Sequence, residues 1–352
     1  MSLFGSIFGS NTYLGIDIGT SSIKIVEISK DKGLPKLKNY GALESYGYLE
    51  RVNNAIQTSS LRFFEKDLIN LLSLLLKKIN TKTTTVIASL PSFSIFSTLI
   101  ELPLMSDGET EKAMGFQARQ YIPMALAEAT LDWIKVGEKE VDGVKIQEVF
   151  LIAVTNDQIK KYEKIFQKIG LKLVALECES LALVRSTVVR DSTPTLIIDI
   201  GAKSTNIIIT EGGFLKYNSQ TDFAGANLTQ SISSGLGISP FRAEELKKRH
   251  GLLGRGGEYE LSTLMTSSLD AILNEVGRAI HEYKGRLERV VLSGGGAKLL
   301  GIDKYFESQL NLPVVRVNPF ERVSYPSDIA PIIKEIDSSF GVAIGLGIRQ
   351  FI

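Results

Sequence analysis

Two segments far apart in the chain have nearly the same pattern of residues. Residues 13–28 read YLGIDIGTSSIKIVEI, and residues 195–210 read TLIIDIGAKSTNIIIT. In each, an apolar β-rich run leads into Asp-Ile-Gly and small polar residues and then into a second apolar run, which is the pattern of a strand, a tight turn and a strand. A repeat of this kind predicts a duplicated α/β domain whose two similar halves face one another.

The rest of the chain alternates helix and strand patterns, and their order predicts three units. Between the repeats we expect a β-rich insert, which contains a hairpin at 131–154 that turns at Asp142-Gly143. A helix at about 177–190 leads into the second half. We therefore expect a first half of residues 1–81, 173–190 and 326–352, an insert of residues 82–172, and a second half of residues 191–325.

The composition excludes several classes of function. The 40 basic and 39 acidic residues nearly cancel, so no strong charge favours nucleic acid as the main partner. One cysteine, Cys178, and two histidines leave almost no material for a zinc site, and the single cysteine suits the reducing cytoplasm. No apolar run reaches the ~20 residues that a membrane-spanning helix needs.

Each Asp-Ile-Gly turn brings together groups that suit a phosphate and a metal ion. Asp17 and Asp199 stand at strand ends, where a carboxylate can hold Mg²⁺ through water. Gly19 and Gly201 allow the backbone N–H groups to approach a phosphate. Two such turns facing each other predict a clamp around a polyphosphate. Its further donors would be Thr20, Ser21, Ser22, Lys24, Ser204 and Thr205.

A third segment, VVLSGGGAKLLGI at residues 290–302, runs from a predicted strand into glycines and a helix. By itself, Gly294-Gly295-Gly296 fits a tight strand-to-helix turn equally well. Together with the two Asp-Ile-Gly turns, it predicts bare backbone against which a purine and a ribose can lie. It is not a Walker loop, because no Gly-Lys-Ser or Gly-Lys-Thr follows, and neither Asp-Ile-Gly turn leads into a helix as a dinucleotide fold requires.

These three segments resemble the phosphate-one, phosphate-two and adenosine motifs of the superfamily of actin, the seventy-kilodalton chaperones and the sugar kinases. The segments LECESLALVRS (176–186) and FGVAIGLGIR (340–349) are similar to the two helices that connect its halves. The resemblance implies an actin-like ATPase fold with two duplicated ribonuclease-H-like domains. It also implies that ATP and Mg²⁺ bind in the cleft between them.

Within the superfamily, the order of parts resembles the FtsA and PilM families, which carry a β-rich subdomain inserted before the first connecting helix. The segments QARQYIPMALAEATLDWIKVG (117–137), FAGANLTQSIS (223–233) and AEELKKRHG (243–251) favour PilM, a type IV pilus family. The sequence stops after GIRQFI, without the linker and amphipathic helix in which FtsA normally ends. We therefore expect no autonomous membrane anchoring.

The resemblance also implies roles for single residues. Asp17 and Asp199 would hold the metal through its waters, and Glu244 and Lys247 would hold the ribose, although their i,i+3 spacing fits an ordinary solvated ion pair as well. Glu179 would position the attacking water, with a surface carboxylate as the alternative, since the usual following proline is Ser180 here. The candidate nucleotide-binding residues are Asp17, Gly19, Thr20, Ser21, Ser22, Lys24, Asp199, Gly201, Lys203, Ser204, Thr205, Gly225, Glu244, Lys247, Gly294, Gly295, Gly296 and Lys298.

The PilM resemblance implies a cytoplasmic ATP-binding scaffold of the type IV pilus inner-membrane assembly complex, with slow or conditional ATP hydrolysis. Its expected partner is the cytoplasmic N-terminal peptide of a bitopic, PilN-like protein, through which alone it would reach the membrane; pilus motor ATPases stay open as further partners. Phe116, Tyr121 and Ile122 would line the peptide's groove, or equally form the core of the insert. Two alternatives stay open: an FtsA-like filament-forming division protein, and a small-molecule kinase, which would need a catalytic base besides the two aspartates.

Overall fold

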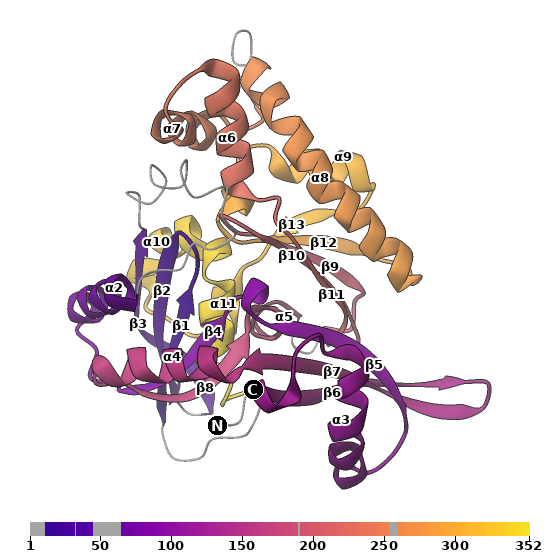
Figure 1. Ribbon diagram of the computed structural model, residues 1–352. Coiled ribbons are helices and arrows are strands. Elements are labelled where there is room, and N and C mark those ends of the chain that lie inside the picture. Colours follow the sequence, from indigo (N-terminus) through magenta and orange to yellow (C-terminus); the bar gives the residue numbers. More distant parts are fainter. Residues whose placement is uncertain (1–10, 32, 45–64, 189–190, 254–258) are drawn as a thin grey trace.

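The structure is a computed structural model that describes residues 11–31, 33–44, 65–188, 191–253 and 259–352. Residues 1–10, which belong to the predicted first half, lie outside the described residues. Within the described part of the chain, no helix is both long and apolar enough to cross a membrane. Figure 1 shows the second half above the first, with the insert beside the first half.

The first half is built on a five-stranded sheet of order β3-β2-β1-β4-β8. The strands β1, β2 and β3 are antiparallel, whereas β4 and β8 run parallel to β1. Nearly every residue of β1 is buried, as expected of a central strand covered on both faces. The bounds are β1 Thr12–Ile18, β2 Ser22–Asp31, β3 Leu34–Glu44, β4 Thr85–Leu90 and β8 Lys172–Cys178.

The second half repeats this arrangement. Its sheet has the order β11-β10-β9-β12-β13, with β9, β10 and β11 antiparallel and β12 and β13 parallel to β9. The two segments recognised as a repeat are β1–β2 and β9–β10, so the predicted duplication is confirmed by the topology. The bounds are β9 Thr195–Ile200, β10 Thr205–Glu211, β11 Phe214–Thr221, β12 Arg289–Ser293 and β13 Val314–Arg316.

Helices cover both sheets. In the first half these are α2 Glu65–Ile79, α4 Asn156–Lys168, α5 Glu179–Val188, α10 Ala330–Ile336 and α11 Gly341–Gly347. In the second half they are α6 Gly225–Leu236, α7 Pro240–His250, α8 Tyr259–Tyr283 and α9 Ile302–Leu310. Ser239 caps α7 by accepting a hydrogen bond from the Arg242 amide. The helices α5 and α11 pack so closely that a Cβ on Gly345 would overlap the Ala182 carbonyl oxygen, which explains the small residues near the end of the sequence.

The insert consists of the three-stranded antiparallel sheet β5-β7-β6 and the helix α3. Its bounds are β5 Phe96–Pro103, α3 Asp107–Tyr121, β6 Ala129–Val141 and β7 Val144–Thr155. The predicted hairpin turn is present at Asp142 and Gly143, whose φ angles of 51° and 78° suit a tight hairpin. Residues of α3 and of the sheet, among them Met114, Ile122 and Leu151, form a separate small core.

The predicted bounds of the insert are wider than its sheet. The prediction of 82–172 includes β4, which lies between β1 and β8 in the first sheet, and α4, which packs on β8 and α2. We therefore propose 91–155 as the bounds of the insert. The helix expected at about 177–190 starts only at Glu179, because Glu177 and Cys178 pair with β4 as the last residues of β8, a strand not predicted from the sequence.

Candidate functional site

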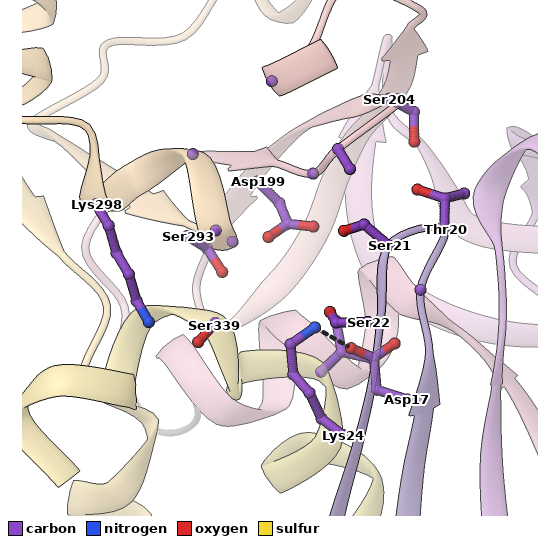
Figure 2. Close-up of a pocket in the computed structure, with 18 of the residues that line it drawn as sticks. Asp17, Thr20, Ser21, Ser22, Lys24, Asp199, Ser204, Ser293, Lys298 and Ser339 are labelled. Carbon is purple, nitrogen blue, oxygen red and sulfur yellow. Dashed lines mark hydrogen bonds and ion pairs between the residues drawn. The ribbon is translucent and has the colours of Figure 1, made fainter. Parts of the chain in front are cut away.

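A cavity of about 530 Å³ lies between the two halves. Its walls are the β1–β2 turn, the β9–β10 turn, the glycine loop after β12, and the first residues of the helices α5, α6 and α11. Figure 2 shows polar side chains from both turns and from the glycine loop directed toward the same space. The structure thus brings together three motifs that are far apart in the sequence.

The two turns have the same backbone geometry. The Gly19 amide donates to the Ser22 carbonyl oxygen over 3.0 Å, and the Gly201 amide donates to the Ser204 carbonyl oxygen over 2.9 Å. A Cβ on Gly201 would lie only 2.8 Å from that oxygen, so the tight turn requires glycine. The predicted equivalence of the two Asp-Ile-Gly turns therefore extends to their hydrogen bonding.

Asp17 lies on β1 directly opposite Lys24 on β2. The Lys24 ammonium group is 3.1 Å from Asp17 Oδ2, and the Ser89 hydroxyl donates to Asp17 Oδ1 over 3.2 Å. Both side chains are largely buried, with 14% of Lys24 and 7% of Asp17 exposed. The first turn therefore places one carboxylate and one cation together on the cleft wall (Figure 2).

Asp199 occupies the equivalent position on β9, opposite Asn206 on β10. Burial raises the pKa of the Asp199 carboxyl, and the nearby Asp17 raises it further, while hydrogen bonding to Ser293 opposes both. The second turn differs from the first in its charge beside the aspartate: an uncharged amide, Asn206, stands where the first turn has Lys24.

Glu179 is the first residue of α5 and lines the cleft. Its Oε2 atom accepts hydrogen bonds from the Ser92 amide at 3.3 Å, the Ser92 hydroxyl at 3.2 Å and Asn206 Nδ2 at 3.3 Å. Burial, with the charges of Asp17 and Asp199, raises the pKa of Glu179 to about 8. Glu179 is therefore part of the cleft wall, and the alternative of a surface carboxylate is wrong.

Three carboxylates, Asp17, Asp199 and Glu179, line this space, and the Lys24 ammonium group is paired with Asp17. Burial and then the neighbouring like charges raise the pKa values of Asp199 and Glu179, so added positive charge would favour their ionised forms. A divalent cation would supply such charge. Over the residues that the structure describes, no three His, Cys, Asp or Glu side chains are grouped closely enough to hold a metal directly. The carboxylates therefore fit an ion that keeps its own waters, as Mg²⁺ does.

The glycine loop approaches the second sheet closely. Gly294 has a φ of 82°, and a Cβ there would lie 2.9 Å from Asp199 Oδ1 and overlap the Ile200 carbonyl oxygen. A Cβ on Gly296 would overlap the Ile200 side chain, whereas a Cβ on Gly295 would meet nothing within 4 Å. Two of the three glycines are thus needed for packing, and the third leaves open space in the cleft.

Glu244 and Lys247 also line the cleft. Their carboxylate and ammonium groups are 2.6 Å apart, and only 14% and 12% of the two side chains are exposed. Lys247 Nζ also donates to the Gly225 carbonyl oxygen over 2.9 Å, which ties α7 to the start of α6. The alternative of a solvated surface ion pair is therefore wrong.

Two of the predicted residues lie outside the cleft wall. Thr205 is fully buried and its hydroxyl donates to the Phe223 carbonyl oxygen over 2.7 Å, so it supports the turn from behind. Lys203 lies on the second turn but outside the set of lining residues. The other predicted residues all line the cavity: Asp17, Gly19, Thr20, Ser21, Ser22, Lys24, Glu179, Asp199, Gly201, Ser204, Gly225, Glu244, Lys247, Gly294, Gly295, Gly296 and Lys298.

Sequence reasoning missed several polar residues at this site, among them Ser89, Ser92, Asn206 and Ser293. Ser89 and Ser92 bond to Asp17 and Glu179, and Ser293 bonds to Asp199. For Asn206 a signal was present, since it aligns with Lys24 in the internal repeat. The serines carry no signal, because only the fold brings them next to the carboxylates.

The model of the family "Type IV pilus assembly protein PilM" matches residues 15–351. Among curated proteins, the cell division protein FtsA of Escherichia coli K12 is 25% identical over 210 residues, which are 49% of this chain and 50% of that protein. The chain thus spans about half the length of the curated relatives it matches.

Among solved structures, the PilM–PilN type IV pilus biogenesis complex matches with a TM-score of 0.81 at 23% identity, covering 97% of this chain and 98% of that one. MreB5 of Spiroplasma citri bound to AMPPNP matches with a TM-score of 0.56 at 15% identity, covering 97% of both chains. At these identities the likeness shows the fold, which is actin-like.

Proposed function

The chain belongs to the type IV pilus assembly protein PilM family, and from this premise we propose that it is an actin-like ATP-binding scaffold of the pilus inner-membrane assembly complex. Its cleft would take Mg-ATP, and its insert would bind the cytoplasmic N-terminal segment of a PilN-like membrane protein. The protein would work in the cytoplasm and reach the inner membrane through that partner. Pilus motor ATPases are candidate further partners.

The observation that carries the nucleotide proposal is the pair of repeat-related turns facing each other across one cavity. The small residues of both turns would let backbone amides approach the phosphates from two sides. Lys24 would neutralise part of the phosphate charge, and Asp17 and Asp199 would hold waters of Mg²⁺. The bound ion would add positive charge beside the three carboxylates of the cleft.

The cleft also supports slow or conditional hydrolysis. A carboxyl whose pKa is about 8, as for Glu179, keeps its proton through most of the neutral range and then accepts no proton from water. In the nucleotide-free protein only a minor fraction of Glu179 is therefore ionised and able to act as a base at neutral pH. Its role would be to orient a water, together with Asn206 and Ser92, once Mg-ATP has changed the charge around it.

The partner proposal comes from the family and from the surface of the insert. Phe116 and Tyr121 on α3 are 66% and 43% exposed, whereas the neighbouring Ile122 is buried in the core of the insert. Of the three residues proposed for the groove, two are thus available to a peptide and one is not. Aromatic side chains suit this task, because they bury much area at little cost in conformational entropy.

The experiment that tests the scaffold proposal is a calorimetric titration with the N-terminal segment of the PilN-like protein, with and without Mg-ATP. We expect saturable binding that weakens when Phe116 and Tyr121 are both replaced by Ser. A control variant, Leu74→Ser, removes an exposed side chain from α2 in the first half. No saturable binding under either condition would remove the pilus assignment and leave the actin-like fold intact. The family match does not favour the division-protein or kinase alternatives.

A further inference from the structure

The insert contacts both halves of the protein. It is joined covalently to the first half, and its strands β5 and β6 also lie against β11 of the second half. Figure 1 shows the lower end of β11 approaching the sheet of the insert. Two polar links connect them, and both lie beyond the residues that line the cleft.

The first link is an ion pair between Lys216 on β11 and Glu148 on β7. Only 17% of each side chain is exposed, so water screens the pair less than an ordinary surface pair. The sheet of the insert leaves room for the Lys216 side chain beside Glu148. The β6–β7 register shifts between Lys135 and Gly137, and a Cβ on Gly137 would overlap the Lys216 ammonium group.

The second link leads to the start of α5. Asn218 Nδ2 on β11 donates to the Ser97 hydroxyl on β5 over 3.1 Å. The Oδ1 atom of Asn218 accepts a hydrogen bond from the Ser180 hydroxyl over 2.6 Å. Ser180 follows Glu179, whose carboxylate is itself held by Ser92 in the short connection between β4 and β5. The insert is therefore linked to the start of α5 by two routes. Ser97 on β5 is linked to Ser180 through Asn218, and Ser92, in the connection before β5, bonds directly to Glu179.

We propose that the insert is a strut between the two halves, which sets the width of the cleft through the Lys216–Glu148 and Ser97–Asn218 links. A cleft between two halves opens by moving one half relative to the other, and any group bonded to both resists that motion. A partner that shifts the insert then changes the cleft, and a ligand that closes the cleft shifts the insert, because such coupling is reciprocal. The consequence for Mg-ATP rests on the proposed function, whereas the effect on the width of the cleft does not.

The test is a distance measurement between the halves of the full, nucleotide-free chain. Spin labels are placed at Lys77→Cys on α2 and Gln309→Cys on α9, two exposed positions. The native Cys178 is buried, so it does not compete for the label. The cut variant combines Lys216→Met with Ser97→Ala, which removes both links and leaves the bond between Asn218 and Ser180.

The control variant combines Lys139→Met with Thr98→Ala. Lys139 pairs with Glu148 and Glu101 from inside the insert, and the Thr98 hydroxyl donates to the Leu99 carbonyl oxygen, so the control loses the same kinds of group without touching β11. We expect a broader distance distribution with a longer component in the cut variant, and the wild-type distribution in the control. Identical distributions in the cut and control variants would overturn the proposal.

A second variant, Glu148→Gln with Ser97→Ala, weakens the strut from the side of the insert and keeps the test valid if the cut variant folds poorly. A Mg-ATP titration of the same proteins separates the two proposals. We expect the dissociation constant to rise about fivefold in the cut variant, at the lower end of usual coupling between sites. A change in distance without any ATP binding by the wild type would support the strut and contradict the nucleotide proposal.

Discussion

Asn206 Nδ2 donates a hydrogen bond to Glu179 Oε2 over 3.3 Å, and this bond joins the second half to the first residue of α5. In the internal repeat Asn206 stands where the first half has Lys24, and each lies opposite the aspartate of its own turn. The duplicated halves have therefore diverged at this position. The first half supplies a cation to its aspartate, whereas the second supplies an amide that reaches across to Glu179.

The raised pKa of Glu179 predicts a dependence of stability on pH. In the unfolded chain this carboxyl has a pKa of about 4.3, whereas in the folded protein it is about 8. Between these values the folded state binds a proton that the unfolded state has lost, so the free energy of unfolding falls as the pH rises. Glu179→Gln removes the titrating carboxyl and therefore this loss. We expect its free energy of unfolding to exceed that of the wild type by on the order of a few kcal/mol at pH 8.5, and by little at pH 5.

Chemical unfolding of the nucleotide-free wild type and of Glu179→Gln at the two pH values checks this prediction. The comparison reports Glu179 together with its electrostatic coupling to Asp17 and Asp199. An equal effect of the substitution at pH 5 and pH 8.5 would show that Glu179 is ionised in the folded protein throughout this range.

The glycine loop offers a pair of neighbouring substitutions with opposite consequences. Gly295→Ala adds a Cβ into open space in the cleft, so we expect an unchanged melting temperature and weaker Mg-ATP binding. Gly294→Ala adds a Cβ at a φ of 82° against the Ile200 carbonyl oxygen, which should cost about 1–3 kcal/mol of stability. Melting curves and nucleotide titrations of both variants test the pair. Unaltered ATP affinity in Gly295→Ala would place the ligand elsewhere.

A second pair of glycines tests the packing of the connecting helices. Gly345→Ala places a Cβ on the Ala182 carbonyl oxygen and should destabilise the protein by more than about 3 kcal/mol, since neither backbone can yield. Gly115 lies exposed on α3 with no atom near its missing Cβ, so Gly115→Ala should stabilise by about 0.5–1 kcal/mol. Denaturant midpoints measure both. Equal effects of the two substitutions would contradict the close approach of α5 and α11.

The internal repeat made the fold readable from the sequence, because two copies of one strand–turn–strand pattern imply two sheets of one topology. The strand β8 was missed because KLVALEC continues directly into the helical pattern of α5, so periodicity alone cannot locate the boundary. The predicted insert of residues 82–172 includes β4 for a similar reason. The sequence of β4 shows an apolar strand, but only its pairing with β1 and β8 assigns it to the first sheet.

The candidate site was more readable than the insert, because the Asp-Ile-Gly turn occurs twice in equivalent positions of the internal repeat. Thr205 was expected in the cleft because it follows Ser204, yet successive side chains of a strand point to opposite faces. The same alternation directs Asn206 toward Glu179. The strut between the insert and β11 had no sequence signal, because it joins residues such as Ser97 and Asn218 that only the tertiary fold brings together.

The central claim is that the two equivalent aspartates together hold Mg-ATP, and a thermal-shift measurement on wild type, Asp17→Asn and Asp199→Asn tests it most directly. At an ATP concentration of 100 times the dissociation constant, binding should stabilise the wild type by about 2.7 kcal/mol. We predict that each variant loses this stabilisation. The nucleotide-free melting temperature of Asp199→Asn should not fall, because the substitution removes one of three carboxylate charges that share the cleft, whereas Asp17→Asn also leaves the Lys24 ammonium group without its carboxylate and should melt lower. A full ATP-dependent shift in both variants would contradict the account.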